Sequence, residues 1–245
     1  MRFRLGTLLL IFISLFSLRA QTIKIIESNS DHIKIELSYA GYYPIKEKVY
    51  QGKKFVYIEK NGMNFRKPGE PWIPYQFYNF GLPYNKVASY KILNLTQEKI
   101  PNISILPYPD SVNQPYEKFK FDPSVYKTNR YFPISPVNIT GQFTMRYIKG
   151  ASLEVAPYQY NPITRELCFN KKILVQINFD PDSHNLVSTI NLKDKLTEDF
   201  VATAFINPKE AKEFIGKPVS IKNPNSAIVD TFRYNPKIIP RKILK

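Results

Sequence analysis

The sequence contains one cysteine, Cys168, and only two histidines, His32 and His184. A single cysteine excludes any disulfide within the chain, so stability must come from a packed core. Two isolated histidines and one cysteine cannot supply a typical zinc ligand set. The scarcity of these residue types therefore excludes most metal centres and leaves few arrangements for nucleophilic catalysis.

The surroundings of Cys168 favour a structural role over a catalytic one. A cysteine nucleophile needs a histidine within hydrogen-bond reach. His32 opens a predicted strand and His184 lies in a predicted turn, whereas Cys168 follows Leu167 inside a strand pattern, where free cysteines are usually buried. A G-x-S-x-G motif is also missing. We therefore predict no catalytic residue and no enzymatic activity for this chain.

Calcium is the remaining metal to consider. The stretch "DPDSHN" could offer it the oxygen atoms of Asp180, Asp182 and Asn185. These residue types form turns without a metal, and the glycine and glutamate of an EF-hand loop are missing. We predict a turn here, and neither a metal nor a cofactor for the chain.

Glycine is scarce, with nine residues against twenty prolines, while aromatic residues make up 14% of the chain. Prolines are pushed to strand edges and turns, and aromatic side chains suit half-buried sheets. This composition predicts an all-β fold, an antiparallel β-sandwich of jelly-roll-like form with short C-terminal helices and an extended tail.

Alternating apolar and polar residues predict the individual strands. Residues 22–37 read as a hairpin, and residues 171–179 are the clearest strand, with Ile173, Val175, Ile177 and Phe179 on one face. A strand at 185–192 is a candidate partner for it. Residues 66–74 are expected to be extended because of their proline spacing. Further strands are expected at residues 53–60, 86–95, 103–107 and 143–148.

Long hydrophobic runs are absent except near the N-terminus, where residues 1–20 combine basic residues, a short apolar run and a small final residue. This order predicts a secretory signal peptide and no other membrane span. We expect a secreted protein, in the periplasm, on the outer surface or outside the cell. Removing the three arginines of this segment lowers the formal net charge from +15 to +12. The lysines are dispersed along strands, which does not favour nucleic-acid binding but suits an acidic partner.

Helical spacing appears only near residues 193–215, with Leu192, Leu196 and Phe200 four residues apart and Pro208 at a predicted helix start. We expect one β domain over residues 21–207. Residues 208–245 are expected to form a short helix and a linker tail. The longest loop-like stretch, residues 108–136, is a candidate for a partner contact.

Four stretches in order resemble the propeptide of gingipain-type cysteine peptidases. They are "KPGEPWIPYQFYNFGLP" (67–83), "ISILPYP" (103–109), "YKTNRYFP" (126–133) and "APYQYNPITRELCFNKKILVQINF" (156–179). The resemblance spans about residues 22–207. The residues that match the family's motifs, for which a structural role is implied, are Pro68, Gly69, Pro71, Pro74, Pro107, Pro133, Pro157, Tyr160, Asn161 and Pro162.

The resemblance implies a secreted prosegment that folds as a β-sandwich, covers the active-site cleft of a gingipain-like cysteine peptidase domain in cis or in trans, and keeps it latent. The catalytic cysteine and histidine would belong to that peptidase domain, which would follow the linker tail and is absent from this chain. In the family, a basic side chain of an inhibitory loop fills the specificity pocket. By position, the candidates are Asn113, Gln114, Lys118 and Lys120, and no arginine stands at the matching position.

A second function from another class is a surface β-sandwich that binds glycan or protein through aromatic side chains. Trp72 is the best stacking platform, followed by Tyr158 and Tyr160. The competing interpretation, which we favour, places Trp72 in the core.

Overall fold

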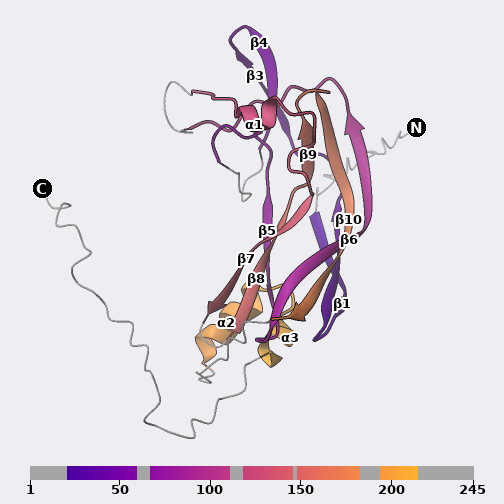
Figure 1. Cartoon of the computed structure of the whole chain (residues 1–245), viewed down its shortest axis with the longest axis vertical. Coiled ribbons are helices and arrows are strands. Elements are labelled where there is room, and N and C mark those ends of the chain that lie inside the picture. The colour runs from indigo at the N-terminus through magenta and orange to yellow at the C-terminus, as the bar shows by residue number, and fades with distance from the viewer. Residues whose placement is uncertain (1–20, 60–66, 111–117, 146–147, 183–193, 215–245) are drawn as a thin grey trace, which may run out of the picture.

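The computed structural model of the chain describes residues 21–59, 67–110, 118–145, 148–182 and 194–214. These residues form three antiparallel sheets and three short helices (Figure 1). The strands are β1 (Gln21–Ser28), β2 (His32–Tyr39), β3 (Ile45–Tyr50), β4 (Lys53–Ile58), β5 (Gln76–Gly81), β6 (Lys86–Ile100), β7 (Val137–Met145), β8 (Ile148–Val155), β9 (Tyr158–Asn161) and β10 (Glu166–Pro181). The helices are α1 (Pro123–Tyr126), α2 (Lys195–Ala204) and α3 (Pro208–Glu213).

The large sheet has the strand order β1-β2-β10-β6, and β9 pairs with the first part of β10. The small sheet has the order β5-β8-β7, and β3 pairs only with β4 in a separate hairpin. All of these pairings are antiparallel. The expected all-β sandwich is therefore confirmed.

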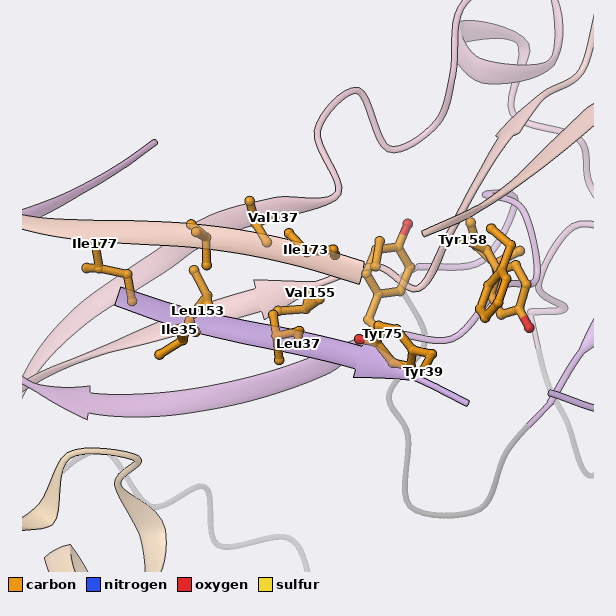
Figure 2. Close-up of a cluster of buried hydrophobic side chains, with 14 of the residues drawn as sticks. Ile35, Leu37, Tyr39, Tyr75, Val137, Leu153, Val155, Tyr158, Ile173 and Ile177 are labelled. Carbon is orange, nitrogen blue, oxygen red and sulfur yellow. The ribbon is translucent and has the colours of Figure 1, made fainter. Parts of the chain in front are cut away.

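The core lies between the inner faces of the large and small sheets (Figure 2). On β2, Ile35 and Leu37 are fully buried, and they alternate with polar residues along the strand. Val175 and Ile173 of β10 lie directly opposite these two residues. Because side chains alternate between the two faces of a strand, this register places one apolar row per strand against the small sheet.

Helix α3 packs on the end of the small sheet. The side chain of Asn207 accepts a hydrogen bond from the backbone N–H of Gly81 and donates one to its carbonyl, at 2.8 and 2.9 Å. A Cβ atom at Gly81 would collide with the side chain of Ala211 in α3. This close approach, rather than a left-handed backbone, explains why glycine suits position 81.

Several expectations for the elements hold. The hairpin at residues 22–37 is β1 and β2, Pro208 opens α3, and the described part of residues 66–74 contains no helix. The four apolar residues expected on one face of β10 are all buried. The candidate strand at residues 185–192 lies outside the described residues, and the described partners of β10 are β2, β6 and β9.

Three expectations differ from the structure. Residues 103–107 form only isolated bridges at Ile105 and Pro107, because a proline there cannot donate to a ladder. Residues 143–148 are not one strand, since β7 ends at Met145 and Ile148 begins its antiparallel partner β8.

The third difference concerns the buried face of α2. Leu196 and Phe200 are 73% and 42% exposed, while Thr197 and Val201 are the buried residues of this helix. The apolar residues spaced by four therefore do not mark the face that packs against the protein.

Candidate functional site

The expected inhibitory segment is joined in the sequence to two of the three described stretches that we call the loop base. These three are residues 67–72, 105–110 and 118–126. The loop base lies with the β3–β4 hairpin at the end of the molecule opposite to α2 and α3 (Figure 1). Residues 111–117, which include the candidates Asn113 and Gln114, lie outside the described residues. The loop base contains the described stretches on both sides of them.

Main-chain hydrogen bonds fix residues 69–72 between these two flanking stretches. On one side, Gly69 donates to the carbonyl of Tyr108 at 2.9 Å, Tyr108 donates to Glu70 at 2.7 Å, and Trp72 donates to Leu106 at 2.9 Å. On the other side, Asp122 donates to the carbonyl of Gly69 at 3.0 Å. A single extended stretch thus holds both flanks of residues 111–117.

Gly69 is required at the centre of this arrangement. Its φ is +92°, a region that residues with a side chain rarely adopt. A Cβ atom there would also lie 3.1 Å from the carbonyl oxygen of Lys120. The glycine therefore permits both the backbone turn and the close approach of the second flank, which contains Lys120.

A small aromatic cluster fills the loop base. Trp72, Leu106 and Phe119 are its buried members. The indole of Trp72 stacks on Tyr57, with ring centroids 4.3 Å apart, and Phe119 meets Tyr50 edge to face at 5.0 Å. The cluster joins the β3–β4 hairpin to both flanks of the expected inhibitory segment.

The burial of Trp72 confirms the core interpretation of this residue. It is 4% exposed, and Tyr158 and Tyr160 are 0% and 3% exposed. None of the three can offer a face to a sugar. The alternative interpretation, in which these three side chains stack on a sugar, is therefore wrong.

Lys118 and Lys120 are both exposed, and Phe119 between them is buried. This alternation directs two cationic side chains away from the aromatic cluster. The ammonium of Lys48, on β3, lies 5.0 Å from the centroid of the Phe119 ring. Phe119 is the anchoring residue that our sequence analysis missed, although the alternation in "KFKF" (118–121) was the available signal.

A cavity of about 370 Å³ separates the two flanks. Its lining includes Asp110 from the first flank, Lys120 and Asp122 from the second, and Lys67 from the stretch between them. Hydrogen bonds from the hydroxyl and the backbone N–H of Ser124 lower the pKa of Asp122 below its ordinary value. Asp122 is therefore ionised at neutral pH and caps the N-terminus of α1.

The other two motif stretches, residues 126–133 and the first part of residues 156–179, lie at the same end of the molecule as the loop base. Phe132 and Tyr160 exchange two backbone hydrogen bonds of 2.8 Å. The hydroxyl of Tyr126 donates to the carbonyl of Ile105 in the loop base at 3.1 Å. Asn161 accepts hydrogen bonds from the backbone N–H groups of Ile163 and Thr164, which shapes the turn between β9 and β10.

The prolines of the motifs lie mostly inside. Pro71 and Pro107 are buried and form a bridge to each other, while Pro68 is exposed. Pro133 follows a cis peptide bond. Pro133, Pro74 and Pro157 are buried, and Pro162 is half-buried. The four stretches are therefore joined in space, although their implied structural role stays a prediction.

Cys168 is 1% exposed, and burial raises the pKa of its thiol from 9.0 to about 11. His32 lies opposite Asn178, ten residues along β10 from Cys168 and therefore about 33 Å away. The carboxylate of Glu27 lies 3.2 Å from the His32 ring. Cys168 and His32 thus form no dyad, and His184 lies outside the described residues.

The described residues contain no group of three histidine, cysteine, aspartate or glutamate side chains that could hold a metal ion. Asp180 accepts a hydrogen bond from Ser89, and Asp182 lies 3.0 Å from the buried ammonium of Lys149. The two carboxylates thus have partners on different strands. Within the same residues, no helix is long and apolar enough to cross a membrane.

The Propeptide_C25 family model matches residues 20–214 of the chain. No curated protein matches it. Two solved structures from Porphyromonas gingivalis are similar in fold. The complex of RgpB pro- and mature domains gives a TM-score of 0.62 at 16% identity and covers 77% of this chain and 97% of that one. The structure described for the zymogenic latency of gingipain K gives a TM-score of 0.52 at 14% identity, with 65% and 93% covered.

Proposed function

Because the chain belongs to the Propeptide_C25 family, we propose that it keeps a gingipain-like cysteine peptidase latent by covering its active-site cleft, and that it assists the folding of that peptidase. The family and the fold make the chain a non-catalytic prosegment. One structure with the same fold contains pro- and mature domains in complex, which supports a peptidase domain as the partner.

The observation that carries the proposal is the loop base. It holds both flanks of residues 111–117 with main-chain hydrogen bonds, and the aromatic cluster anchors the second flank through Phe119. A binding segment that is fixed at both ends loses less conformational entropy when it enters a cleft. This arrangement suits a segment that must occupy a peptidase without being released as a product.

The charge of the second flank supports a cleft with an acidic pocket. Lys118 and Lys120 are exposed beside the cavity that separates the flanks. An ammonium group that enters a desolvated pocket gains most when a carboxylate faces it. We propose that one of these lysines, or Asn113 or Gln114 on the neighbouring stretch, enters the specificity pocket.

Propeptides of this family belong to secreted proteases. We propose that residues 1–20 are a signal peptide and that the chain acts in the periplasm, on the outer surface or outside the cell. N-terminal sequencing of the exported protein tests this point, with Gln21 expected as the first residue.

The direct test of latency is inhibition. The purified full chain, added in increasing amounts to an active gingipain-like peptidase, should abolish cleavage of Lys- or Arg-containing fluorogenic peptides at a stoichiometry near one to one. The same chain unfolded by heat should not inhibit. If the folded chain leaves the cleavage rate unchanged with both types of peptide, the proposed function is wrong.

A further inference from the structure

A second cavity, of about 450 Å³, is lined in part by Glu70, and its described lining includes neither Lys118 nor Lys120. Its lining comes from α1, from residues 130–135, from the start of β7 and from β6. The volume is in the range of pockets that bind ligands in proteins. The cavity is therefore large enough to receive a side chain of another molecule.

Glu70 is the unusual residue of this lining. It is 7% exposed, and no hydrogen-bond donor among the described residues reaches its buried oxygen Oε2. Its nearest described cation is Lys67, whose ammonium lies 3.6 Å from the other oxygen and whose side chain is 71% exposed. Such an exposed lysine screens the carboxylate only weakly. A buried carboxylate oxygen without a donor is costly, and folded proteins rarely keep one without a use for it.

The rest of the lining suits an alkyl stem with a cationic head. Tyr90 and Phe132 contribute aromatic rings, against which an aliphatic stem can pack and to which a cation is attracted. Ser135 and Asn138 contribute oxygen atoms that can accept hydrogen bonds from an ammonium or a guanidinium. Arg130 is exposed and is the one cationic side chain among the described lining residues.

We propose that this cavity receives the alkylammonium or alkylguanidinium group of a Lys or Arg side chain on the surface of the peptidase partner. The source of the group rests on the proposed function, whereas the site itself rests on Glu70 and its surroundings. The contact is a second anchor, separate from the segment that enters the cleft. In the free prosegment, Oε2 of Glu70 has no hydrogen-bond donor among the described residues, and the partner supplies one on binding.

Glu70→Gln tests the proposal, because glutamine keeps the shape of the side chain and removes its charge. We measure the dissociation constant of the complex between the full chain and a gingipain-like peptidase whose catalytic cysteine is replaced by alanine. The variant should bind about 10- to 100-fold more weakly, mainly through faster dissociation. Its Tm should stay unchanged or rise by about 2–4 °C, since no donor among the described residues stabilises the charge on Oε2 of the free chain. A purely structural Glu70 would instead lower the Tm.

Arg130→Gln is the matched control. Removing this cation from the lining should make the complex tighter, because Arg130 repels an incoming cation. If Arg130→Gln lowers the Tm and weakens the complex as much as Glu70→Gln weakens it, Arg130 is the natural partner of Glu70 and the proposal is overturned.

A small probe tests the site without the peptidase. N-acetyl-arginine amide, titrated into the full chain and followed by NMR, should shift signals of the wild type but not of Glu70→Gln, and N-acetyl-norleucine amide should shift neither. A tight wild-type complex that Glu70→Gln does not weaken overturns this proposal and leaves the proposed function intact. If the wild type binds no peptidase, the proposed function fails. Glu70-dependent binding of the probe would then still show that the cavity binds a cationic side chain. It would also show that this side chain does not come from a peptidase.

Discussion

The sandwich core and the loop base are stabilised in different ways. In the core, aliphatic side chains of β2, β8 and β10, such as Ile35, Leu153 and Val175, are fully buried, and long antiparallel ladders connect the strands of each sheet. In the loop base, Trp72 and Phe119 dominate a smaller aromatic cluster, and short stretches are joined by isolated hydrogen bonds.

The contrast indicates two roles: the sandwich core is the rigid scaffold, and the loop base positions the segment expected to contact the partner. A regular ladder opens only when much of the sheet opens, whereas a few isolated hydrogen bonds can break locally. Residues 111–117 are attached to the second type of structure. The loop base therefore controls the geometry of the proposed inhibitory segment and influences the global stability of the sandwich less than the core does. The predictions that follow are ordered by their expected effect on the stability of the free chain.

The largest effect is expected for Ile35→Ala in the sandwich core. Ile35 is fully buried, and its loss should lower the free energy of unfolding by about 2–5 kcal/mol in urea denaturation. The matched control is Ile25→Ala on β1, because Ile25 lies directly opposite Ile35 but is 40% exposed. The control should lower the free energy of unfolding clearly less. Equal losses for the two variants would contradict the assignment of the core to the space between the sheets.

A smaller and more local effect is expected for Gly69→Ala in the loop base. The positive φ and the approach of the Lys120 carbonyl should cost about 1–3 kcal/mol, measured by thermal unfolding. Inhibition of the peptidase should fall more than this loss of stability explains, since the substitution displaces a flank of the inhibitory segment. Gly141→Ala is the control, because a Cβ atom at Gly141 meets nothing within 4 Å. It should leave inhibition unchanged.

The same contrast explains which parts of the fold could be predicted from the sequence. β2 and β10 were predicted because each has one buried face, and burial of one face imposes an alternating pattern on the sequence. The buried face of α2 was not predicted, because a few apolar residues spaced by four do not identify the neighbour of a helix. Phe200 is exposed and Val201 is buried, although both are apolar.

The loop base was less predictable than the sandwich. The main-chain hydrogen bonds between its stretches join residues 34 positions apart (Trp72 and Leu106) to 53 positions apart (Gly69 and Asp122), and they follow no period that a pattern could reveal. Lys118 and Lys120 were expected on a loop surface and are exposed, whereas the roles of Asn113 and Gln114 remain predictions. The burial of Glu70 had no sequence signal, because a charged residue between Gly69 and Pro71 is typical of an exposed turn.

Cys168→Ser should have a modest effect on stability, about 1 kcal/mol, because it places a hydroxyl in an apolar site. Inhibition should be unchanged. The native wild-type thiol should not react with Ellman's reagent at pH 8, and it should react in urea. Loss of inhibition by a folded Cys168→Ser variant would contradict the structural role of this residue.

The raised pKa of Cys168 adds a pH dependence with a definite sign. Between pH 9 and about 11 the folded chain keeps the thiol proton that the unfolded chain releases. The folded state therefore binds more protons than the unfolded state, and the stability of the wild type should fall in this range. The Cys168→Ser variant should lose less stability over the same range in urea denaturation at each pH. Parallel losses would show that the thiol does not contribute.

The smallest effect on stability is expected for the double substitution of Lys118 and Lys120 by alanine. Both side chains are exposed, so the free energy of unfolding should change by less than about 0.5 kcal/mol. Inhibition should nevertheless weaken by about 10- to 100-fold, because a charged contact in a desolvated pocket is lost. Lys91→Ala, on the exposed face of β6, is the control and should inhibit as the wild type does. If the double variant also inhibits normally, the residue that enters the specificity pocket lies elsewhere, and Asn113 and Gln114 become the next positions to replace. Either result sharpens the comparison, because it shows whether the loop base contributes the residue that enters the cleft or only positions the segment that contains it.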